Sequence, residues 1–256
     1  MYKERIVIKV GTNVMTNKDN RIIKPVLEGL VKQIAELYER DIICVLVSSG
    51  SVIAGKEVLG KSKIEDRTQR RQVYSAIGQP RMMRLYYGIF HDYGMKCAQV
   101  LPTKNDFKAG VHRENMISCY EGLLAEGVIP VANEDDAVSV TTSMFSDNDE
   151  LASLIAELIN ADKLIILTDI DGLYNGHPEE HDSDVIRTVN PNENLEKYIK
   201  DSGKTEGEGR GGMGSKLGFA QQTAAKNIPT FIANGKKNNT IIDIIEGKSI
   251  GTKVAL

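Results

Sequence analysis

Short polar side chains lie at both ends of one segment, residues 146–174. The run D-N-D at 147–149 precedes a stretch with helical periodicity, and Thr168 and Asp169 follow the apolar run 164–167. In open α/β sheets, ligands bind beyond the carboxyl ends of strands and at helix N-termini. Both kinds of position carry polar groups here. We therefore expect this segment to form part of an active site.

A lysine interrupts the first apolar run, residues 6–10. Burying the charge of Lys9 costs free energy unless a partner compensates it, and Gly11 lets the backbone pass close to a ligand. We therefore expect Lys9 to belong to a binding site. An alternative places Lys9 at a sheet edge, with its ammonium group reaching solvent.

Hydroxyl groups follow the second apolar run, residues 42–47. Ser48, Ser49 and Ser51 surround Gly50 where the next helix is predicted to begin. Hydroxyls and free backbone N–H groups at such a turn can hold a carboxylate or a phosphate. Helix capping by Ser51 is an alternative that is compatible with this role.

Four consecutive polar residues, 133–136, follow the fourth apolar run, and three of them are acidic. Such a turn favours an ammonium group or a metal over an anion. A solvated loop is the alternative interpretation. Because the turn after residue 47 favours an anion and this one favours an ammonium group, the two together suggest a zwitterion such as an amino acid.

The glycine-rich segment 209–214 matches the dinucleotide pattern G-x-G-x-x-G, but residues 201–208 before it are not a predicted strand. The order Gly-Ser-Lys at 214–216 also differs from the Gly-Lys-Ser of a phosphate loop. We reject both motifs. Glycine N–H groups at a helix start, with Lys216 in the first turn, nevertheless suit nucleotide phosphates. We also reject the H-x-x-E-H zinc pattern at 177–181, because its proline and loop-like flanks argue against a helix.

Apolar runs rich in isoleucine and valine alternate with longer segments of helical periodicity. This pattern predicts a mainly parallel open sheet covered on both faces, and right-handed crossovers make it a three-layer α/β/α sandwich. We expect a single domain over residues 1–256 and a mobile loop at 201–214. The predicted strands are 6–10, 42–47, 96–101, 128–132, 164–167 and 230–233, and the predicted helices are 25–40, 67–93, 113–126, 150–160 and 213–227.

Composition excludes several classes of protein. A net charge of -3 with both signs interspersed argues against a nucleic-acid-binding surface. Cys44, Cys97 and Cys119 are odd in number and widely spaced, which indicates reduced thiols. No signal-peptide pattern precedes the first strand, and no apolar run approaches the roughly 20 residues that span a bilayer. We expect a cytoplasmic protein with no membrane partner.

A set of short motifs resembles the amino acid kinase family, and within it the members that phosphorylate free L-glutamate at the entry to proline biosynthesis. The resemblance covers essentially the whole chain, and the set in this order is more specific than any single motif. The motifs are K-V-G-T at 9–12, V-S-S-G at 47–50, A-I-G-Q at 76–79, N-E-D-D at 133–136, D-N-D at 147–149, L-T-D at 167–169, and G-G-M at 211–213 with Lys216.

The resemblance implies roles for individual residues. Lys9 and Lys216 would neutralise charge on the transferring phosphoryl group, and Asp149 would hold their ammonium groups in place. The amino acid would be bound by Ser49, Gly50, Asp136 and Asn148, with Asn133 close by. ATP, its phosphates bridged by Mg²⁺, would contact Lys9, Thr168, Asp169, Arg210, Gly211, Gly212, Met213, Gly214, Ser215 and Lys216.

The implied reaction transfers the γ-phosphoryl group of ATP to the γ-carboxylate of L-glutamate. Residues up to about 160 would bind the amino acid, and residues from about 161 would bind ATP. The resemblance also implies a homo-oligomer, feedback inhibition by proline, and a downstream glutamyl phosphate reductase that consumes the acyl phosphate.

Some positions depart from the family pattern. Arg210 stands where threonine is common, Gly214 where serine is common, and Ser146 where glycine is frequent. We expect no appended RNA-binding-like domain of the PUA type. Alternative functions are a kinase of the same family acting on aspartate, acetylglutamate, carbamate or UMP, and a non-catalytic nucleotide-binding or storage protein of this fold. A dinucleotide oxidoreductase is a weaker alternative, since its fingerprint lacks the preceding strand.

Overall fold

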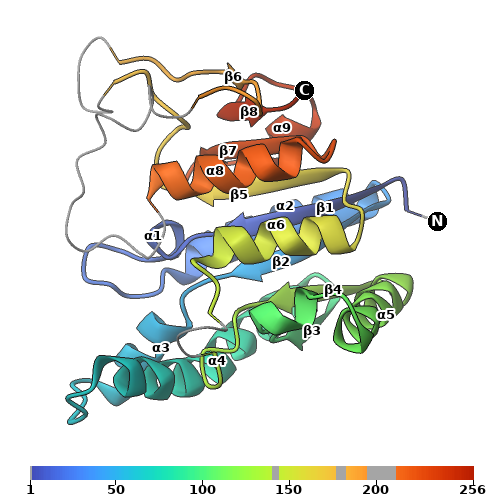
Figure 1. Ribbon diagram of the computed structural model, residues 1–256. Helices are drawn as coiled ribbons and strands as arrows, with labels where there is room; N and C mark the ends of the chain where they lie inside the picture. Colours follow the sequence, from blue (N-terminus) through green and yellow to red (C-terminus); the bar gives the residue numbers. More distant parts are fainter. Residues whose placement is uncertain (1, 140–143, 177–182, 195–211) are drawn as a thin grey trace.

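The computed structural model describes residues 2–139, 144–176, 183–194 and 212–256. Within these residues an eight-stranded sheet runs through the middle of the protein (Figure 1). The strands are β1 (Glu4–Val10), β2 (Ile42–Ser48), β3 (Lys96–Val100), β4 (Val128–Ala132), β5 (Lys163–Thr168), β6 (Thr188–Val189), β7 (Thr230–Asn234) and β8 (Thr252–Val254).

The strand order is β3-β4-β2-β1-β5-β7-β8-β6. The paired neighbours are parallel except β7 and β8, which are antiparallel. The prediction of a mainly parallel open sheet is therefore confirmed. The strands β6 and β8 were not predicted, because two or three residues are too few to show an apolar run.

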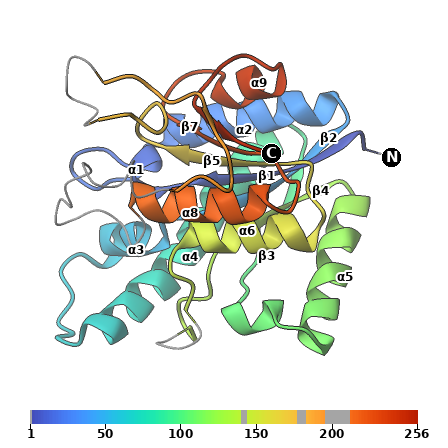
Figure 2. The same ribbon diagram turned by 45° about the horizontal axis from the view of Figure 1, so that its top comes forward.

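Helices cover both faces of the sheet (Figures 1 and 2). Figure 2 shows α6 and α8 side by side on one face and α2 with α9 on the other, so the predicted three-layer α/β/α fold is confirmed. The helices are α1 (Thr12–Met15), α2 (Lys24–Glu39), α3 (Ser51–Leu59), α4 (Arg67–Asp92), α5 (Val111–Ala125), α6 (Asn148–Leu158), α8 (Met213–Ala224) and α9 (Thr240–Ile245), with a 3₁₀ turn η1 at Lys104–Phe107.

The central strands are buried on both faces. Every residue of β2 is buried, and so are the last five residues of β1 and of β5. Such strands read as continuous apolar runs, which is why their positions follow from the sequence. Lys9 is 4% exposed and lies in β1, between β2 and β5. The alternative that placed Lys9 at a sheet edge is therefore wrong.

Membrane crossing by a helix finds no support in the structure: among the described residues, no helix combines the length and the apolar character that a bilayer span requires.

The helices α3 and α4 approach each other so closely that only glycine fits at two contact positions. A Cβ atom on Gly78 would overlap the carbonyl group of Ser51, and one on Gly55 would overlap the carbonyl group of Tyr74. This close approach brings the Ser75 hydroxyl of α4 to within 3.1 Å of the Ser51 hydroxyl of α3. The two glycines therefore set the distance between helices that both carry polar groups at the sheet's edge.

Gly78→Ala should destabilise the protein by about 1–3 kcal/mol, because the added methyl group forces α3 and α4 apart. Gly88→Ala is the matched control on the same helix, where an added Cβ meets no heavy atom within 4 Å. It should be neutral or stabilise by up to about 1 kcal/mol. Urea unfolding of both variants tests this, and equal stability of the two would contradict the packing argument.

Candidate active site

Two lysines and one aspartate meet at the carboxyl edge of the sheet. Lys9 belongs to β1, Asp149 to the first turn of α6, and Lys216 to the first turn of α8. Lys9 Nζ lies 2.6 Å from Asp149 Oδ1, and Lys216 Nζ lies 2.8 Å from Asp149 Oδ2. The Asp149 side chain is fully buried, and that of Lys216 is 14% exposed. One carboxylate thus bridges two ammonium groups from distant parts of the chain.

Burial and charge together set the ionisation of this cluster. Burial is the largest influence on Lys9 and lowers its pKa, an effect that Lys216 strengthens and Asp149 opposes. Burial by itself would raise the pKa of Asp149, but the charges of Lys9 and Lys216 outweigh it and lower that pKa. Asp149 is therefore a carboxylate at neutral pH, in contact with two ammonium groups.

Asp147 ties the first turns of α6 and α8 together. Its Oδ1 accepts hydrogen bonds from the backbone N–H groups of Asp149 (2.7 Å) and Glu150 (3.2 Å), so it caps α6. Its Oδ2 accepts a hydrogen bond from Ser215 Oγ at 3.0 Å. Burial and the neighbouring Asp149 raise the pKa of Asp147. Asp147 was predicted only as part of a polar cluster, and its pairing with Ser215 has no local signal in the sequence.

A hydrogen-bonded network of amides and hydroxyls continues from this cluster. Asn148 Nδ2 donates to Ser49 Oγ and to Asn133 Oδ1, both at 2.9 Å. Asn133 Nδ2 donates in turn to Gln79 Oε1 at 3.0 Å and to Ser51 Oγ at 3.3 Å. The structure therefore brings the predicted residues Ser49, Asn133 and Asn148 together.

The turn between β2 and α3 contains a glycine in the left-handed region. Gly50 is the N-cap residue of α3 with φ of +101°, a conformation that favours glycine. Ser51 is the first residue of the helix, and no side chain caps this end. The alternative in which Ser51 caps α3 is therefore wrong: its hydroxyl accepts from Ser75 and Asn133 instead.

The acidic turn after β4 is buried, so the alternative of a solvated loop is wrong. Glu134 and Asp136 are each 5% exposed. Glu134 Oε1 accepts a hydrogen bond from the backbone N–H of Phe145 at 2.9 Å. Two residues of α4 compensate the buried charge of Asp136. Arg71 Nη2 lies 2.8 Å from Oδ1, and Ser75 Oγ donates to Oδ2 at 2.9 Å. Arg71 was not predicted, because it lies 65 positions from its partner.

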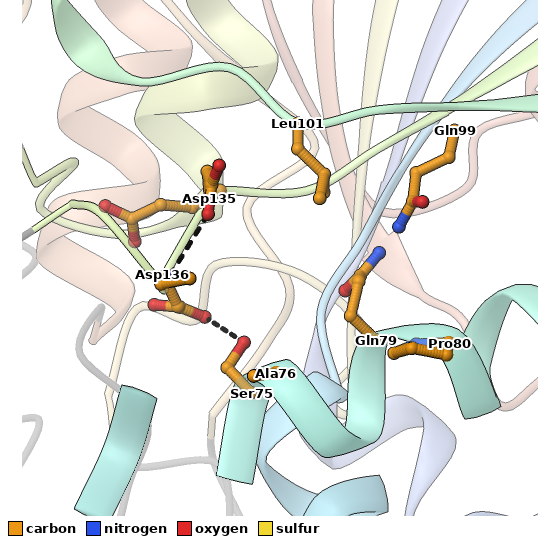
Figure 3. Close-up of a pocket in the computed structure, with 10 residues that line it drawn as sticks. Ser75, Ala76, Gln79, Pro80, Gln99, Leu101, Asp135 and Asp136 are labelled. Atoms are coloured by element: carbon orange, nitrogen blue, oxygen red, sulfur yellow. Dashed lines mark hydrogen bonds between the residues drawn. The ribbon is translucent and has the colours of Figure 1, made fainter. Parts of the chain in front are cut away.

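A cavity of about 190 Å³ adjoins this turn (Figure 3). Its walls come from α4, from the end of β3 and from the turn that follows β4. Gln79 and Gln99 face each other across it, while Ser75 points toward Asp136 (Figure 3). Ser75 and Gln79 therefore belong both to the cavity wall and to the polar network.

Of the predicted nucleotide residues, Lys9 lies in β1, Thr168 and Asp169 lie at the carboxyl end of β5, and residues 212–216 form the start of α8. Thr168, the last residue of β5, donates from Oγ1 to Asp169 Oδ1 at 3.2 Å. The helix α8 begins at Met213, and its N-cap residue Gly212 has no side chain with which to cap it. Backbone N–H groups at a helix start favour an anion. Arg210 and Gly211 lie outside the described residues, as do the predicted loop up to residue 211 and the rejected zinc pattern at 177–181.

The polar cluster after the apolar run 164–167 also includes Asp171, whose partners Asn234 and Lys237 were not predicted. Asp171 accepts hydrogen bonds from Asn234 Nδ2 at 2.9 Å and from Lys237 Nζ at 2.6 Å, and the Lys237 hydrogen bond is the largest cause of its lowered pKa. It joins the carboxyl ends of β5 and β7, which pair as neighbours. The sequence N-G-K-K directly after the apolar run 230–233 was the signal that could have indicated these partners of Asp171.

Solved structures share this fold. Isopentenyl phosphate kinase from T. acidophilum matches with a TM-score of 0.69 at 18% identity, covering 98% of this chain and 99% of that one. Carbamate kinase from Giardia lamblia matches with a TM-score of 0.70 at 17% identity, covering 98% of each chain. At this level of identity the likeness concerns the fold alone.

Curated relatives are more similar in sequence. The glutamate 5-kinase of Bacteroides thetaiotaomicron is 40% identical over 242 residues, which cover 94% of this chain and 67% of that protein. The glutamate 5-kinase of Alkaliphilus metalliredigens is 38% identical over 251 residues, which cover 97% of this chain and 94% of that protein. The family model described as "Amino acid kinase family" matches residues 4–234. The chain has this match, this order of strands, and two lysines joined by one aspartate at the carboxyl edge of the sheet. It therefore belongs to the amino acid kinase family.

Proposed function

We propose that the chain phosphorylates the γ-carboxylate of L-glutamate with MgATP, giving L-glutamyl 5-phosphate and ADP, the first step of proline biosynthesis. The observation that carries the phosphoryl transfer is the Lys9–Asp149–Lys216 cluster, because two ammonium groups held by one buried carboxylate suit a transferring phosphoryl group. The choice of glutamate rests on the curated relatives, whose name states this acceptor.

The residues of the site divide between the two substrates. Ser49, Gly50, Asn133, Asp136 and Asn148 bind glutamate. ATP contacts Lys9, Thr168, Asp169 and the start of α8 up to Lys216, with Arg210 and Gly211 preceding it. Apart from Lys9, the part of the chain before about residue 160 binds the amino acid and the part after it binds ATP.

The mechanism requires positioning and charge neutralisation more than proton transfer. A carboxylate is already ionised at neutral pH, so its attack on the γ-phosphorus in line with the leaving ADP needs no general base. Lys9 and Lys216 neutralise the charge that shifts onto the phosphoryl oxygens. Asp149 orients both ammonium groups by contacting each with a separate oxygen.

Mg²⁺, when bound, neutralises charge on the nucleotide phosphates. We propose that the phosphates themselves supply most of its ligands. Both oxygens of Asp149 are in contact with ammonium groups, and Asp147 accepts hydrogen bonds on both of its oxygens, so neither carboxylate is arranged primarily for a metal. Further parts of the proposal are a cytoplasmic homo-oligomer, feedback inhibition by proline, and a reductase that consumes the acyl phosphate.

The deciding experiment measures ADP release from MgATP with glutamate, aspartate, acetylglutamate, carbamate and UMP offered separately. Hydroxylamine is present to trap an acyl phosphate as a hydroxamate. We expect ADP release and hydroxamate with glutamate alone. Release with a different acceptor would overturn the choice of glutamate and keep the kinase assignment, and no release with any acceptor would overturn both.

A further inference from the structure

The carboxylate at the end of the acidic turn is already neutralised by an arginine. Arg71 donates from Nε (3.2 Å) and from Nη2 (2.8 Å) to Oδ1 of Asp136, while Ser75 occupies Oδ2. Arg71 and Ser75 lie one helical turn apart on α4, so both reach the turn from the same face. Asp136 is buried, whereas the Arg71 side chain is 37% exposed.

This pairing changes which ligand the turn can accept. A buried carboxylate alone would attract any ammonium group, including a simple amine. With a guanidinium group beside it, an incoming ammonium group also meets a like charge, which opposes binding. A ligand that carries an ammonium group and a carboxylate on the same carbon avoids this cost, since each of its charges has an opposite partner in the site.

Arg71 has donors left for a second carboxylate. A guanidinium group carries five N–H donors in a fixed planar fork that matches carboxylate geometry. Within the part of the chain that the structure describes, no hydrogen bond involves Arg71 Nη1, and the side chain reaches solvent at this point. The guanidinium group can therefore hold Asp136 with one edge and a substrate carboxylate with another.

We propose that Arg71 binds the α-carboxylate of the amino-acid substrate while Asp136 binds its α-ammonium group. The inference rests on the proposed phosphorylation of glutamate and names the residue that makes the site specific for a free α-amino acid. It also predicts that a ligand lacking either charge, such as an N-acylated amino acid or an α-decarboxylated one, binds poorly.

The test removes each charge from the ligand and from the protein in turn. The ligands are L-glutamate, 4-aminobutanoate, which lacks the α-carboxylate, and glutarate, which lacks the ammonium group. The KM of glutamate and the inhibition constants of the two analogues are measured for the wild type, Arg71→Gln and Asp136→Asn.

Arg71→Gln should raise the KM of glutamate and the inhibition constant of glutarate about 10- to 100-fold, the effect of losing one charge-assisted hydrogen-bonded pair. The inhibition constant of 4-aminobutanoate should not rise, and it should fall to the extent that the like charge of Arg71 opposes the ammonium group, because that ligand has no carboxylate for Arg71. Asp136→Asn should show the opposite selectivity: glutamate and 4-aminobutanoate bind more weakly, and glutarate does not.

Two controls separate recognition from structural support. Gln72 also fastens α4 to this turn, because its Nε2 donates to the carbonyl oxygen of Ala137 at 2.8 Å, yet it carries no charge. Gln72→Ala should therefore affect the three ligands alike. Arg84→Gln removes an exposed arginine from the same helix, away from Asp136, and should leave all three constants unchanged.

Equal loss of affinity for glutamate and 4-aminobutanoate in Arg71→Gln would overturn the inference, since Arg71 would then only support the turn. Unchanged affinity for glutamate would overturn it as well. In both cases the wild type still phosphorylates glutamate, so the proposed function stands. A wild type that does not phosphorylate glutamate would instead overturn the proposed function, and this inference with it.

Discussion

Lys216→Ala should lower kcat by about 100- to 1000-fold, the cost of removing one preorganised charge-stabilising donor. Lys9→Ala should have an effect of the same size, because the two ammonium groups contact the same carboxylate from opposite oxygens. Both values come from steady-state ADP release at saturating MgATP and glutamate. The loss should fall on kcat and on kcat/KM alike, which is the signature of an interaction made in the transition state.

The stability of Lys216→Ala should stay near that of the wild type, because Asp149 keeps its ion pair with Lys9. Lys226→Ala is the control. Lys226 follows the C-terminal end of α8, is 56% exposed and forms a surface ion pair with Glu157, so it should leave kcat unchanged. Near-wild-type turnover by a folded Lys216→Ala or Lys9→Ala protein would remove these lysines from the proposed mechanism.

Asp149→Asn should lose both turnover and stability. Its kcat should fall at least about 100-fold with a smaller change in KM, since the proposed role of Asp149 is to orient the lysines. Removing one partner of a buried ion pair leaves the charge of Lys9 uncompensated at 4% exposure, which should cost about 3–5 kcal/mol of unfolding free energy at pH 7. Activity assays and urea unfolding measure the two effects.

The stability deficit of Asp149→Asn should depend on pH in a defined direction. In the wild type, burial holds the folded-state pKa of Lys9 below the unfolded value of about 10.4, and Asp149 partly offsets this effect. Without Asp149, the folded-state pKa of Lys9 is lower still. Between the folded and unfolded pKa values the unfolded chain binds more protons, so the stability of the variant rises with pH. The deficit should therefore shrink between pH 7 and pH 10.

Glu157→Gln is the matched control for this experiment. Glu157 lies on the same helix as Asp149 and also pairs with a lysine, but at the surface. Its replacement should cost less than about 1 kcal/mol. A deficit in Asp149→Asn that matches the control, or one that does not shrink as the pH rises, would contradict a buried, uncompensated Lys9.

Most secondary structure could be predicted from the sequence because each element carries its own pattern. Buried parallel strands are continuous in apolar residues, and helices repeat apolar residues at intervals of three and four. The predicted helix 67–93 therefore differs from α4 (Arg67–Asp92) by one residue. The strands β6 and β8 escaped prediction because their short segments are held by pairing with distant partners.

The sequence by itself determined which residues are exceptional for their position. A lysine in an apolar strand and a cluster of short polar residues before a helix both contradict what a plain structural element needs, and this contradiction is visible locally. It also determined the order of elements, which brings the strand ends to one edge. The family resemblance added the pairing of Lys9, Asp149 and Lys216.

Only the tertiary structure decided how charges and close contacts are matched across the chain. The pairing of Arg71 with Asp136, the hydrogen bond between Asp147 and Ser215, and the contact of Gly78 with α3 each join residues far apart in sequence. An acidic turn looks the same locally whether an arginine neutralises it or not. The partner is set by how the helices pack on the sheet, so only the folded chain shows that Arg71 neutralises this turn.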